Sequence, residues 1–334
     1  MSTPASPRTP LRAAVIGAGG IGSRLDRPGD WGTDGAPITH AGGYWASPAF
    51  ELAALADTAA DLGDEAARWG CAAYADVAAM LAAERPDVVS LCLPTAAQVA
   101  WLPRLLDFGV RAVVAEKPLV RHVAEGEAIL DAYRRAGVPL LVNYTRRFVG
   151  LYRAMATRFA GGGVLTATIR YAKGVRHNGT HAIDLARLLF GEVRSARALA
   201  ARYDHWGDDP TVTAFLTLDH CPELVLQSLD ERCFTLFEVD VVTCDGRWII
   251  DGDHRRLRRW TVADGQGIPP GLRLVLAEET GTGHEQAIPT LMDNLRAVVW
   301  DGADPLCRGD DALAAQRVAA ALADQARGLD GVSR

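Results

Sequence analysis

The chain has 334 residues, of which 49% are hydrophobic and 23% are charged, and its formal net charge is −6 at pH 7. This length favours two domains, the composition argues against wholesale disorder, and the acidic balance offers no basic surface for nucleic acid or an anionic membrane. The six cysteines include no Cys-x-x-Cys pair, so neither a zinc ribbon nor a redox dithiol is indicated.

Residues 1–10 are rich in Pro, Ser and Thr and read as a flexible N-terminus. They lack the basic and then apolar layout of a signal peptide, and no apolar run approaches the ~18 residues of a membrane span. We therefore expect a cytoplasmic protein that works on small molecules, with no membrane or nucleic-acid partner.

A short apolar segment, residues 11–16, reads as a buried parallel strand and runs directly into a glycine-rich turn. Gly17, Gly19 and Gly22 follow it at the G-x-G-x-x-G spacing of a dinucleotide site. In such a site the first glycine permits the tight turn, the second lets the backbone approach a pyrophosphate, and the third lets the next helix pack closely. The helix start offers N–H groups to the phosphates. We expect coenzyme contacts from Gly17, Ala18, Gly19, Gly20, Ile21 and Gly22.

A helix beginning near Gly20 is interrupted by residues 27–39, which are too rich in Gly and Pro to be regular and indicate an insertion. This loop, with Trp31, either covers a ligand or elaborates the surface. Residues 40–47 can resume the helix, and residues 50–56 read as the second strand, ending at Asp57. An acidic residue there typically accepts the ribose hydroxyls and repels a 2′-phosphate, which favours NAD over NADP. The alternative is that Asp57 caps the next helix.

Further strands are expected at 87–94, 112–115 and 139–143, with helices at 61–69, 76–84, 101–108 and 121–136. Residues 11–143 thus predict an α/β Rossmann domain. Ligands in open parallel sheets bind beyond the carboxyl ends of the strands, so more coenzyme contacts are expected there. These are Leu93, Pro94, Thr95, Gln98, Glu116 and Lys117.

From about residue 164 the pattern changes to strands with partial alternation and intervening turns, which indicates an antiparallel sheet. The expected strands are 164–171, 196–203, 212–218, 223–229, 235–243, 247–251 and 272–277, with helices at 180–190, 285–300 and 309–327. Residues 144–334 thus predict an α+β domain for substrate binding and oligomerisation, with a mainly antiparallel open sheet. We expect a second subunit to cover that sheet, in a homodimer or homotetramer.

Residues 171–191 carry the densest set of polar groups in this second domain, on a loop that runs into a helix. Asn178 or Thr180 is a plausible N-cap, which would place His181 in the first turn and Asp184 on the same face. A histidine beside a helix N-terminus is disfavoured in its charged form, and this suits a general base. Alternatively, His177, His181 and Asp184 bind a metal, although the dinucleotide turn would then be unexplained.

The glycine turn, Glu116-Lys117-Pro118, the run 146–148 and the His181-x-x-Asp184 helix together resemble the Gfo/Idh/MocA oxidoreductase family over nearly the whole chain. The resemblance implies that Lys117 orients the substrate and assists proton transfer. The family commonly has an Asp four residues before the helical histidine, and His177 stands there in this chain. The implied reaction is hydride transfer between a carbinol carbon and nicotinamide, with His181 as base, Lys117 as second candidate, and His177 relaying protons or binding substrate.

Basic residues near these positions exceed what a neutral polyol needs, which favours a phosphorylated or nucleotide-activated sugar. The expected substrate contacts are Lys117, Asn143, Arg146, Arg147, Lys173, Asn178, His181 and Asp184. An inositol, another cyclitol or a free sugar is the alternative substrate. A function of another class also stays open, namely an NAD-binding regulator or sensor that has lost catalysis, and no metal site is expected.

Overall fold

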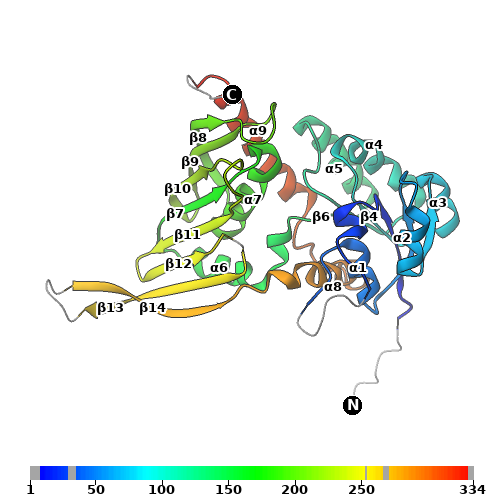
Figure 1. The fold of residues 1–334 in the computed structure, drawn as a ribbon, viewed down its shortest axis with the longest axis horizontal. Helices are drawn as coiled ribbons and strands as arrows, with labels where there is room; N and C mark the ends of the chain where they lie inside the picture. Colours follow the sequence, from blue (N-terminus) through cyan, green and yellow to red (C-terminus); the bar gives the residue numbers. More distant parts are fainter. Residues whose placement is uncertain (1–7, 29–34, 253, 266–270, 330–334) are drawn as a thin grey trace, which may run out of the picture. The chain divides into compact units, whose positions relative to one another are not determined.

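The structure is a computed structural model that describes residues 8–28, 35–252, 254–265 and 271–329. The chain forms two compact units (Figure 1). Unit 1 comprises Met1–Phe148 and Glu285–Asp310, and unit 2 comprises Val149–His284 and Asp311–Arg334. The chain therefore returns to unit 1 near its end, whereas the sequence predicted a single boundary between residues 143 and 144. This return depends on long-range packing, which local sequence patterns do not report.

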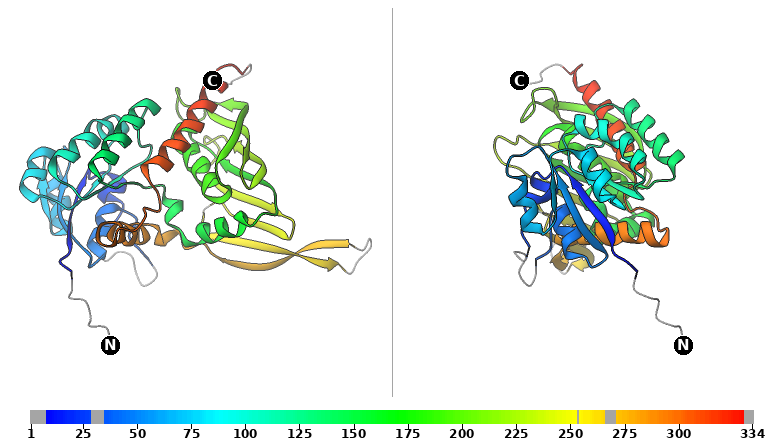
Figure 2. Two further views of the ribbon diagram at one scale, coloured as in Figure 1. Left: turned by 180° about the vertical axis from the view of Figure 1, so that it is seen from behind. Right: turned by 90° about the vertical axis from the view of Figure 1, so that its right-hand side faces the viewer.

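Unit 1 is built on a six-stranded parallel sheet of order β3-β2-β1-β4-β5-β6. Its strands are β1 (Leu11–Ile16), β2 (Phe50–Ala56), β3 (Ala72–Tyr74), β4 (Val88–Leu91), β5 (Ala112–Ala115) and β6 (Leu140–Val142). The three central strands are short apolar runs that are almost completely buried, as expected for a parallel sheet covered on both faces. Helices lie on both sides of it (Figure 2). The Rossmann fold predicted from the sequence is confirmed.

The helices of unit 1 connect these strands, and one arrives from the C-terminal part of the chain. They are the π-helical turn η1 (Gly20–Arg24), α1 (His40–Ala46), α2 (Leu62–Trp69), α3 (Val77–Glu84), α4 (Thr95–Leu105), η2 (Leu106–Phe108), α5 (Val123–Ala136), η3 (Thr145–Phe148) and α8 (Ala287–Asp301). Helix α8 packs against α1 and η3. The 3-10 turn η5 (His284–Gln286) precedes α8.

The insertion separates η1 from α1, and its two ends are held together. Oδ2 of Asp26 accepts hydrogen bonds from the N–H groups of Ile38 and Thr39, both at 2.7 Å. Thr39 then caps α1, because its hydroxyl accepts the N–H of Gly42 at 3.0 Å. The insertion is thus closed at its base, so the second half of the interrupted helix starts at a fixed point. Trp31 lies outside the described residues, so the predicted covering role of this loop stays a prediction.

Unit 2 contains an eight-stranded mixed sheet of order β14-β13-β12-β11-β7-β10-β9-β8, in which only the pair β7–β10 is parallel. Its strands are β7 (Val164–Tyr171), β8 (Val193–Arg202), β9 (Thr211–Leu218), β10 (Cys221–Ser228), β11 (Glu238–Thr243), β12 (Gly246–Ile250), β13 (Arg256–Gly265) and β14 (Gly271–Gly281). The mainly antiparallel sheet predicted from the sequence is confirmed.

Helices α6 (Gly150–Ala160) and α7 (Gly179–Phe190) pack together, and α7 also packs against β7 and β9. The long helix α9 (Gly309–Ala326) ends the described chain. Helix α6 was not predicted, although Tyr152, Met155 and Phe159 recur at helical spacing and are buried. Strand β13 was not predicted either, because its arginines interrupt the alternation of apolar and polar residues that indicates a strand.

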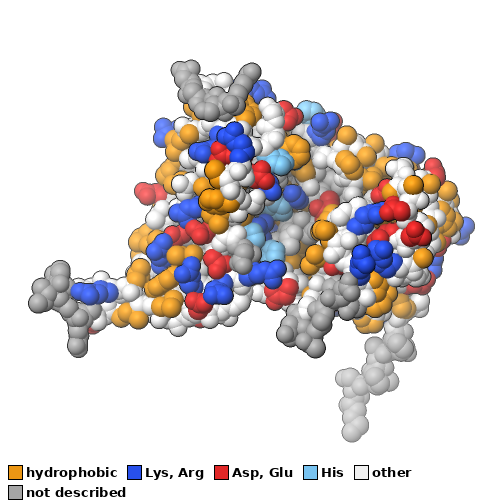
Figure 3. Space-filling view, in the orientation of Figure 1, with side chains coloured by type: hydrophobic (Ala, Val, Ile, Leu, Met, Phe, Trp, Pro, Cys, Tyr) orange, Lys and Arg blue, Asp and Glu red, His pale blue; other side chains and the backbone are white. Residues whose placement is uncertain are grey.

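The hairpin of β13 and β14 extends beyond the rest of the sheet, and apolar and basic side chains lie along it (Figure 3). Leu272, Leu274 and Leu276 alternate along β14 and are 74%, 46% and 50% exposed. Among the described residues, no helix combines the length and apolar character that crossing a membrane requires.

Candidate active site

The glycine turn after β1 has the geometry that a dinucleotide requires. Gly17 has a φ of +94°, and a Cβ placed on it would lie 2.4 Å from the carbonyl oxygen of Cys92. A Cβ on Gly22 would lie 1.9 Å from the carbonyl oxygen of Gly17. By contrast, a Cβ on Gly19 would meet open space, with nothing within 4 Å. Gly17 and Gly22 are therefore required by the fold, whereas Gly19 leaves room where a pyrophosphate approaches the backbone.

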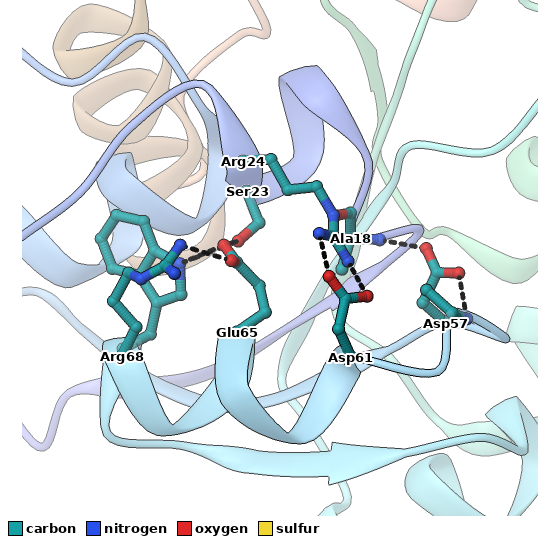
Figure 4. A network of polar contacts seen from close by, with 9 residues as sticks. Ala18, Ser23, Arg24, Asp57, Asp61, Glu65 and Arg68 are labelled. Carbon is teal, nitrogen blue, oxygen red and sulfur yellow. Dashed lines mark hydrogen bonds and ion pairs between the residues drawn. The ribbon is translucent and has the colours of Figure 1, made fainter.

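Asp57, at the end of β2, is tied to the glycine turn (Figure 4). Its Oδ2 accepts the N–H of Ala18 at 2.7 Å, and its Oδ1 accepts the N–H of Ala59 at 3.0 Å. Asp57 does not cap the next helix, because α2 begins only at Leu62, after Asp61. The carboxylate thus lies beside the turn, where the adenosine ribose of a dinucleotide is bound in this class of site.

Arg24, in the last turn of η1, lies beside this carboxylate. Its guanidinium forms two hydrogen bonds of 2.6 Å to the carboxylate of Asp61, and its Nε donates to the carbonyl of Ala18 at 3.0 Å. The hydrogen bond to Asp61 raises the pKa of Arg24 and lowers the pKa of Asp61. A cation is therefore held near the ribose position, with its charge already balanced by Asp61.

A buried acidic residue of α2, Glu65, anchors the short helical turn η1 (Figure 4). Glu65, on α2, accepts a hydrogen bond from the hydroxyl of Ser23 and another, at 3.1 Å, from the indole N–H of Trp69. It also forms an ion pair of 2.6 Å with Arg68. The helix that follows the glycine turn is interrupted after five residues, so this network replaces the rigidity that a longer helix would give.

The parallel sheet brings the other predicted coenzyme residues to the same edge. Leu93 follows β4, and its side chain lies 3.2 Å from the Cβ position of Gly17. Pro94 and Thr95 start α4. Gln98 is buried, and its amide nitrogen donates to the carbonyls of residues 116, 118 and 119, so it shapes the segment that carries Lys117. Contact of these residues with a coenzyme stays a prediction.

Lys117 follows β5 and is partly buried. The Lys117–Pro118 peptide bond is cis, and the backbone N–H of Lys117 lies 3.3 Å from Oε2 of Glu116. Burial lowers the pKa of the Lys117 ammonium, Glu116 opposes this by favouring the charged form, and Arg146 lowers the pKa further. Arg146 is therefore close enough to influence Lys117.

Glu116 is held by a buried polar network that sequence analysis did not identify. Its Oε1 lies 3.0 Å from Nε2 of His40 and 2.8 Å from the amide nitrogen of Asn143. Nδ1 of His40 lies 2.8 Å from the hydroxyl of Ser90, which lies 2.7 Å from the hydroxyl of Tyr44. His40 follows the insertion directly, and only the tertiary structure brings it to Glu116.

Two buried acceptors in this region have no hydrogen-bond partner within the described residues. They are Oδ1 of Asn143 and Oε1 of Gln98. Both side chains donate hydrogen bonds to Glu116. Buried acceptors without partners are rare in proteins, and a bound water is a common explanation for them. The open space at Gly19, beside the close backbone approaches at Gly17 and Gly22, fits the turn of a dinucleotide site.

In unit 2 the polar segment begins with a π-helical turn, η4 (Gly174–Asn178), which continues into α7 with helical backbone at Gly179. Asn178 occupies the N-cap position of α7, as predicted, but its side chain does not cap the helix, and Thr180 lies inside α7. The amide of Asn178 donates to the carbonyl of Ala172 at 2.9 Å, and the hydroxyl of Thr180 donates to the carbonyl of His177 at 3.2 Å. His181 lies in the first turn of α7, as predicted, and the helical turn η4 directly precedes that turn.

The basic residues predicted to bind substrate have different environments. Arg146 and Arg147 in η3 are each only 8% exposed. Lys173 is partly exposed, and its Nζ lies 3.2 Å from Glu231, whose other oxygen lies 2.8 Å from Nδ1 of His205. The hydrogen bonds from His205 and Lys173 lower the pKa of Glu231. Lys173 therefore has an acidic partner, whereas the two arginines are buried in unit 1.

Asp184 is buried in α7, with its carboxylate 3.9 Å from the guanidinium of Arg187. A role in substrate binding stays a prediction for this residue. No group of three or more His, Cys, Asp or Glu side chains in the described ranges is arranged to hold a metal ion. Lys117 belongs to unit 1, whereas His177 and His181 belong to unit 2, and their meeting around one hydroxyl group also stays a prediction.

The order β3-β2-β1-β4-β5-β6, with a glycine turn after β1, defines the first unit as a Rossmann dinucleotide-binding fold. Residues 11–144 match the model of the oxidoreductase family GFO_IDH_MocA, described as an NAD-binding Rossmann fold. This segment of the chain belongs to the Gfo/Idh/MocA oxidoreductase family.

Two curated proteins are similar to part of the chain. The dTDP-3,4-didehydro-2,6-dideoxy-alpha-D-glucose 3-reductase of Streptomyces violaceoruber is 29% identical over 182 residues, covering 48% of this chain and 53% of that protein. The D-glucoside 3-dehydrogenase of Escherichia coli (strain K12) is 30% identical over 142 residues, covering 42% of this chain and 36% of that protein. The chain therefore spans about half, or less, of the length of these relatives.

A solved structure extends the likeness to the whole fold. The UDP-N-acetylglucosamine 3-dehydrogenase of Acidithiobacillus ferrooxidans superposes with a TM-score of 0.72 and 20% identity, covering 95% of this chain and 98% of that chain. At this identity the match concerns the fold, which is therefore shared through unit 2 as well as unit 1.

Proposed function

We propose that the protein is an NAD-dependent oxidoreductase that transfers hydride between a carbinol carbon of a sugar and the coenzyme. The observation that carries this proposal is the joint presence, at one edge of the unit 1 sheet, of an open glycine turn and a partly buried lysine with a lowered pKa. A protein that only binds a dinucleotide has no need of such a lysine.

When bound, the nicotinamide ring supplies the hydride acceptor or donor. The turn formed by Gly17, Gly19 and Gly22 would hold the pyrophosphate. Lys117 donates a hydrogen bond to the reacting oxygen and stabilises the negative charge that develops as its proton leaves, an effect typically worth ~10²-fold or more in rate. The proton passes to an imidazole of the helical segment 174–190, and the sequence favours His181 for this role.

For the substrate, we propose a nucleotide-activated or phosphorylated sugar. The number of basic residues near the predicted site, among them Arg146, Arg147 and Lys173, supports this class, because a neutral polyol needs fewer. One curated relative acts on a dTDP-sugar by name, and both relatives described above are named for reaction at position 3 of a glucose-type ring. These names support position 3 as our proposal for the reacting carbon. A free sugar or a cyclitol is the alternative.

For the coenzyme, we propose NAD rather than NADP. The carboxylate of Asp57 lies beside the glycine turn and would repel a 2′-phosphate. The nearby cation Arg24 is already paired with Asp61 and is not offered to such a phosphate.

We further propose a homodimer or homotetramer formed through the sheet of unit 2. Strands β7, β9 and β10 alternate buried residues with partly exposed ones, which leaves one face of the sheet incompletely covered. Light scattering coupled to size-exclusion chromatography measures the oligomeric state, and a monomer at micromolar concentration would contradict this assignment.

The function is tested by incubating the protein with NAD or NADP and a panel of nucleotide sugars, sugar phosphates, free sugars and cyclitols. Reduced coenzyme is followed by absorbance, and the product is examined by NMR to locate the new carbonyl. We expect turnover with an activated sugar, and severe loss of turnover in Lys117→Ala with NAD binding retained. If NAD binds but no compound turns over, the protein is a coenzyme-binding regulator instead.

A further inference from the structure

Asp209 in unit 2 precedes β9 and is almost fully buried, with 2% of the residue exposed. Its carboxylate accepts the backbone N–H of Arg176 at 3.0 Å and the backbone N–H of His177 at 3.0 Å. It therefore reaches the start of the helical segment that carries both candidate imidazoles. This approach requires Gly174, where a Cβ would lie 2.0 Å from Oδ2 of Asp209.

The same carboxylate also binds the side chain of His177. Oδ2 of Asp209 lies 2.9 Å from Nδ1 of the imidazole. A carboxylate only accepts hydrogen bonds, so Nδ1 carries the hydrogen, and Nε2 of the neutral ring has a free electron pair. The His177 side chain is 45% exposed, so this pair is accessible to a ligand.

The ring plane of His177 is fixed by a second contact. The indole of Trp206 stacks on it, with ring centroids 4.6 Å apart and an interplanar angle of 18°. Trp206 is held in turn by the edge of His205, at 4.6 Å and 70°, and His205 forms an ion pair with Glu231. The imidazole is thus bound along one edge and covered on one face, which fixes the direction in which Nε2 points.

We propose that Asp209 and His177 form a carboxylate–imidazole pair in which Nε2 of His177 is the proton acceptor for the substrate hydroxyl. This inference rests on the proposed function. On oxidation the O–H bond breaks and its proton forms a bond to Nε2, while the carbinol C–H bond breaks and its electron pair leaves as hydride to the oxidised coenzyme. Asp209 stays a carboxylate and stabilises the imidazolium; in the reverse reaction Nε2 returns the proton.

This assignment explains a substitution that the sequence left without a role. A histidine stands where the family commonly has an aspartate, and the structure supplies a carboxylate to that histidine from a loop far along the chain. Asp209 is a positioning residue in this scheme, and His177 is the catalytic residue. In this scheme neither His181 nor Lys117 is the proton acceptor.

The alternative is that Asp209 only caps the helix through the two backbone N–H groups. Three variants and a control separate the two. Asp209→Asn keeps an acceptor for the backbone but presents an amide donor to the ring. His177→Asn can still donate to Asp209 but has no basic nitrogen. Asp204→Asn is the control, because Asp204 also binds backbone in this loop, accepting the N–H of Lys173 at 3.0 Å, without touching an imidazole.

The first measurement needs neither coenzyme nor substrate. Long-range ¹H–¹⁵N correlation spectra of histidine-labelled protein distinguish the two tautomers, and comparison with His177→Asn assigns the signal. We expect the Nδ1–H form in the wild type and in Asp204→Asn, and the Nε2–H form in Asp209→Asn. A wild-type ring protonated on Nε2, or a tautomer unchanged in Asp209→Asn, overturns the proposal.

The second measurement is steady-state kinetics with NAD and a substrate from the panel. We expect His177→Asn and Asp209→Asn to lower kcat by about 10²-fold or more, with KM changed less than about threefold. The double variant should be no slower than His177→Asn, because the carboxylate acts through the ring. If Asp209→Asn has the wild-type kcat, or lowers it equally when His177 is already replaced, Asp209 is only a cap and the proposal fails.

The proposed function and the Asp209–His177 pair are contradicted by different results. A wild-type protein that oxidises or reduces none of the compounds contradicts the proposed function, whereas the tautomer measurement still decides whether the pair exists. If the wild type turns over and His177→Asn does so equally well, the oxidoreductase assignment stands, and His181 or Lys117 is the proton acceptor instead.

Discussion

Nε2 of His40 lies 3.0 Å from Oε1 of Glu116, so the first residue of α1 supports the carboxylate that precedes Lys117. His40 is completely buried. In a neutral ring that donates from Nε2 to Glu116, Nδ1 of His40 accepts from the hydroxyl of Ser90. A chain of defined hydrogen bonds thus runs from the interior of unit 1 to the backbone of Lys117.

Replacing His40 with alanine should weaken both the fold and the site. Glu116 keeps its bond from Asn143 and Ser90 keeps its bond to Tyr44, but each loses one buried hydrogen bond, which costs roughly 0.5–1.5 kcal/mol. We expect the free energy of unfolding in urea to fall by at least this amount, together with kcat. His220→Ala, at an exposed histidine of unit 2, is the control and should change stability by less than about 0.5 kcal/mol. A His40→Ala variant with the wild-type free energy of unfolding and kcat would mean that the network does not support Glu116.

The pKa of Lys117 should move in opposite directions in two neighbouring variants. Glu116 favours the ammonium form and Arg146 disfavours it. Glu116→Gln should therefore lower the pKa of Lys117 further, and Arg146→Met should raise it. The rate of lysine modification at Lys117, measured against pH by mass spectrometry, reports the neutral amine. Shifts of the same sign in both variants would show that these charges do not control Lys117.

Two glycines of the turn should differ sharply when replaced by alanine. The Cβ in Gly22→Ala would overlap the carbonyl of Gly17, so we expect a loss of stability, seen as a lower Tm. The Cβ in Gly19→Ala meets no protein atom, so Tm should stay near that of the wild type while NAD binding weakens by tenfold or more. Calorimetry of NAD binding measures the second effect. Wild-type affinity in Gly19→Ala would place the pyrophosphate elsewhere.

Coenzyme preference should depend on Asp57 and Asp61 together. Asp57→Ser removes the carboxylate that repels a 2′-phosphate, and Asp61→Ala frees the guanidinium of Arg24. We expect kcat/KM for NADP, relative to NAD, to rise in Asp57→Ser and to rise further in the double variant. The ratio is measured with both coenzymes at one pH and ionic strength. A ratio unaffected by either change would show that neither residue lies at the ribose.

Local sequence patterns were sufficient for much of unit 1. The buried strands and the glycine turn follow from short apolar runs that end in turn residues, and the structure has them at nearly the predicted positions. The patterns were weaker in unit 2, where β13 carries arginines at partly exposed positions and α6 begins without a capping side chain. An exposed hairpin and an uncapped helix have less distinct local patterns than a buried parallel strand.

The sequence by itself determined the Rossmann fold, the glycine turn, Asp57 and the position of Lys117 at a strand end, because each depends on residues close together in the chain. Only the tertiary structure decided which groups support them. His40 reaches Glu116 across 76 residues, and Asp209 reaches His177 across 32. Such contacts are fixed by strand order and loop closure, which no local periodicity encodes.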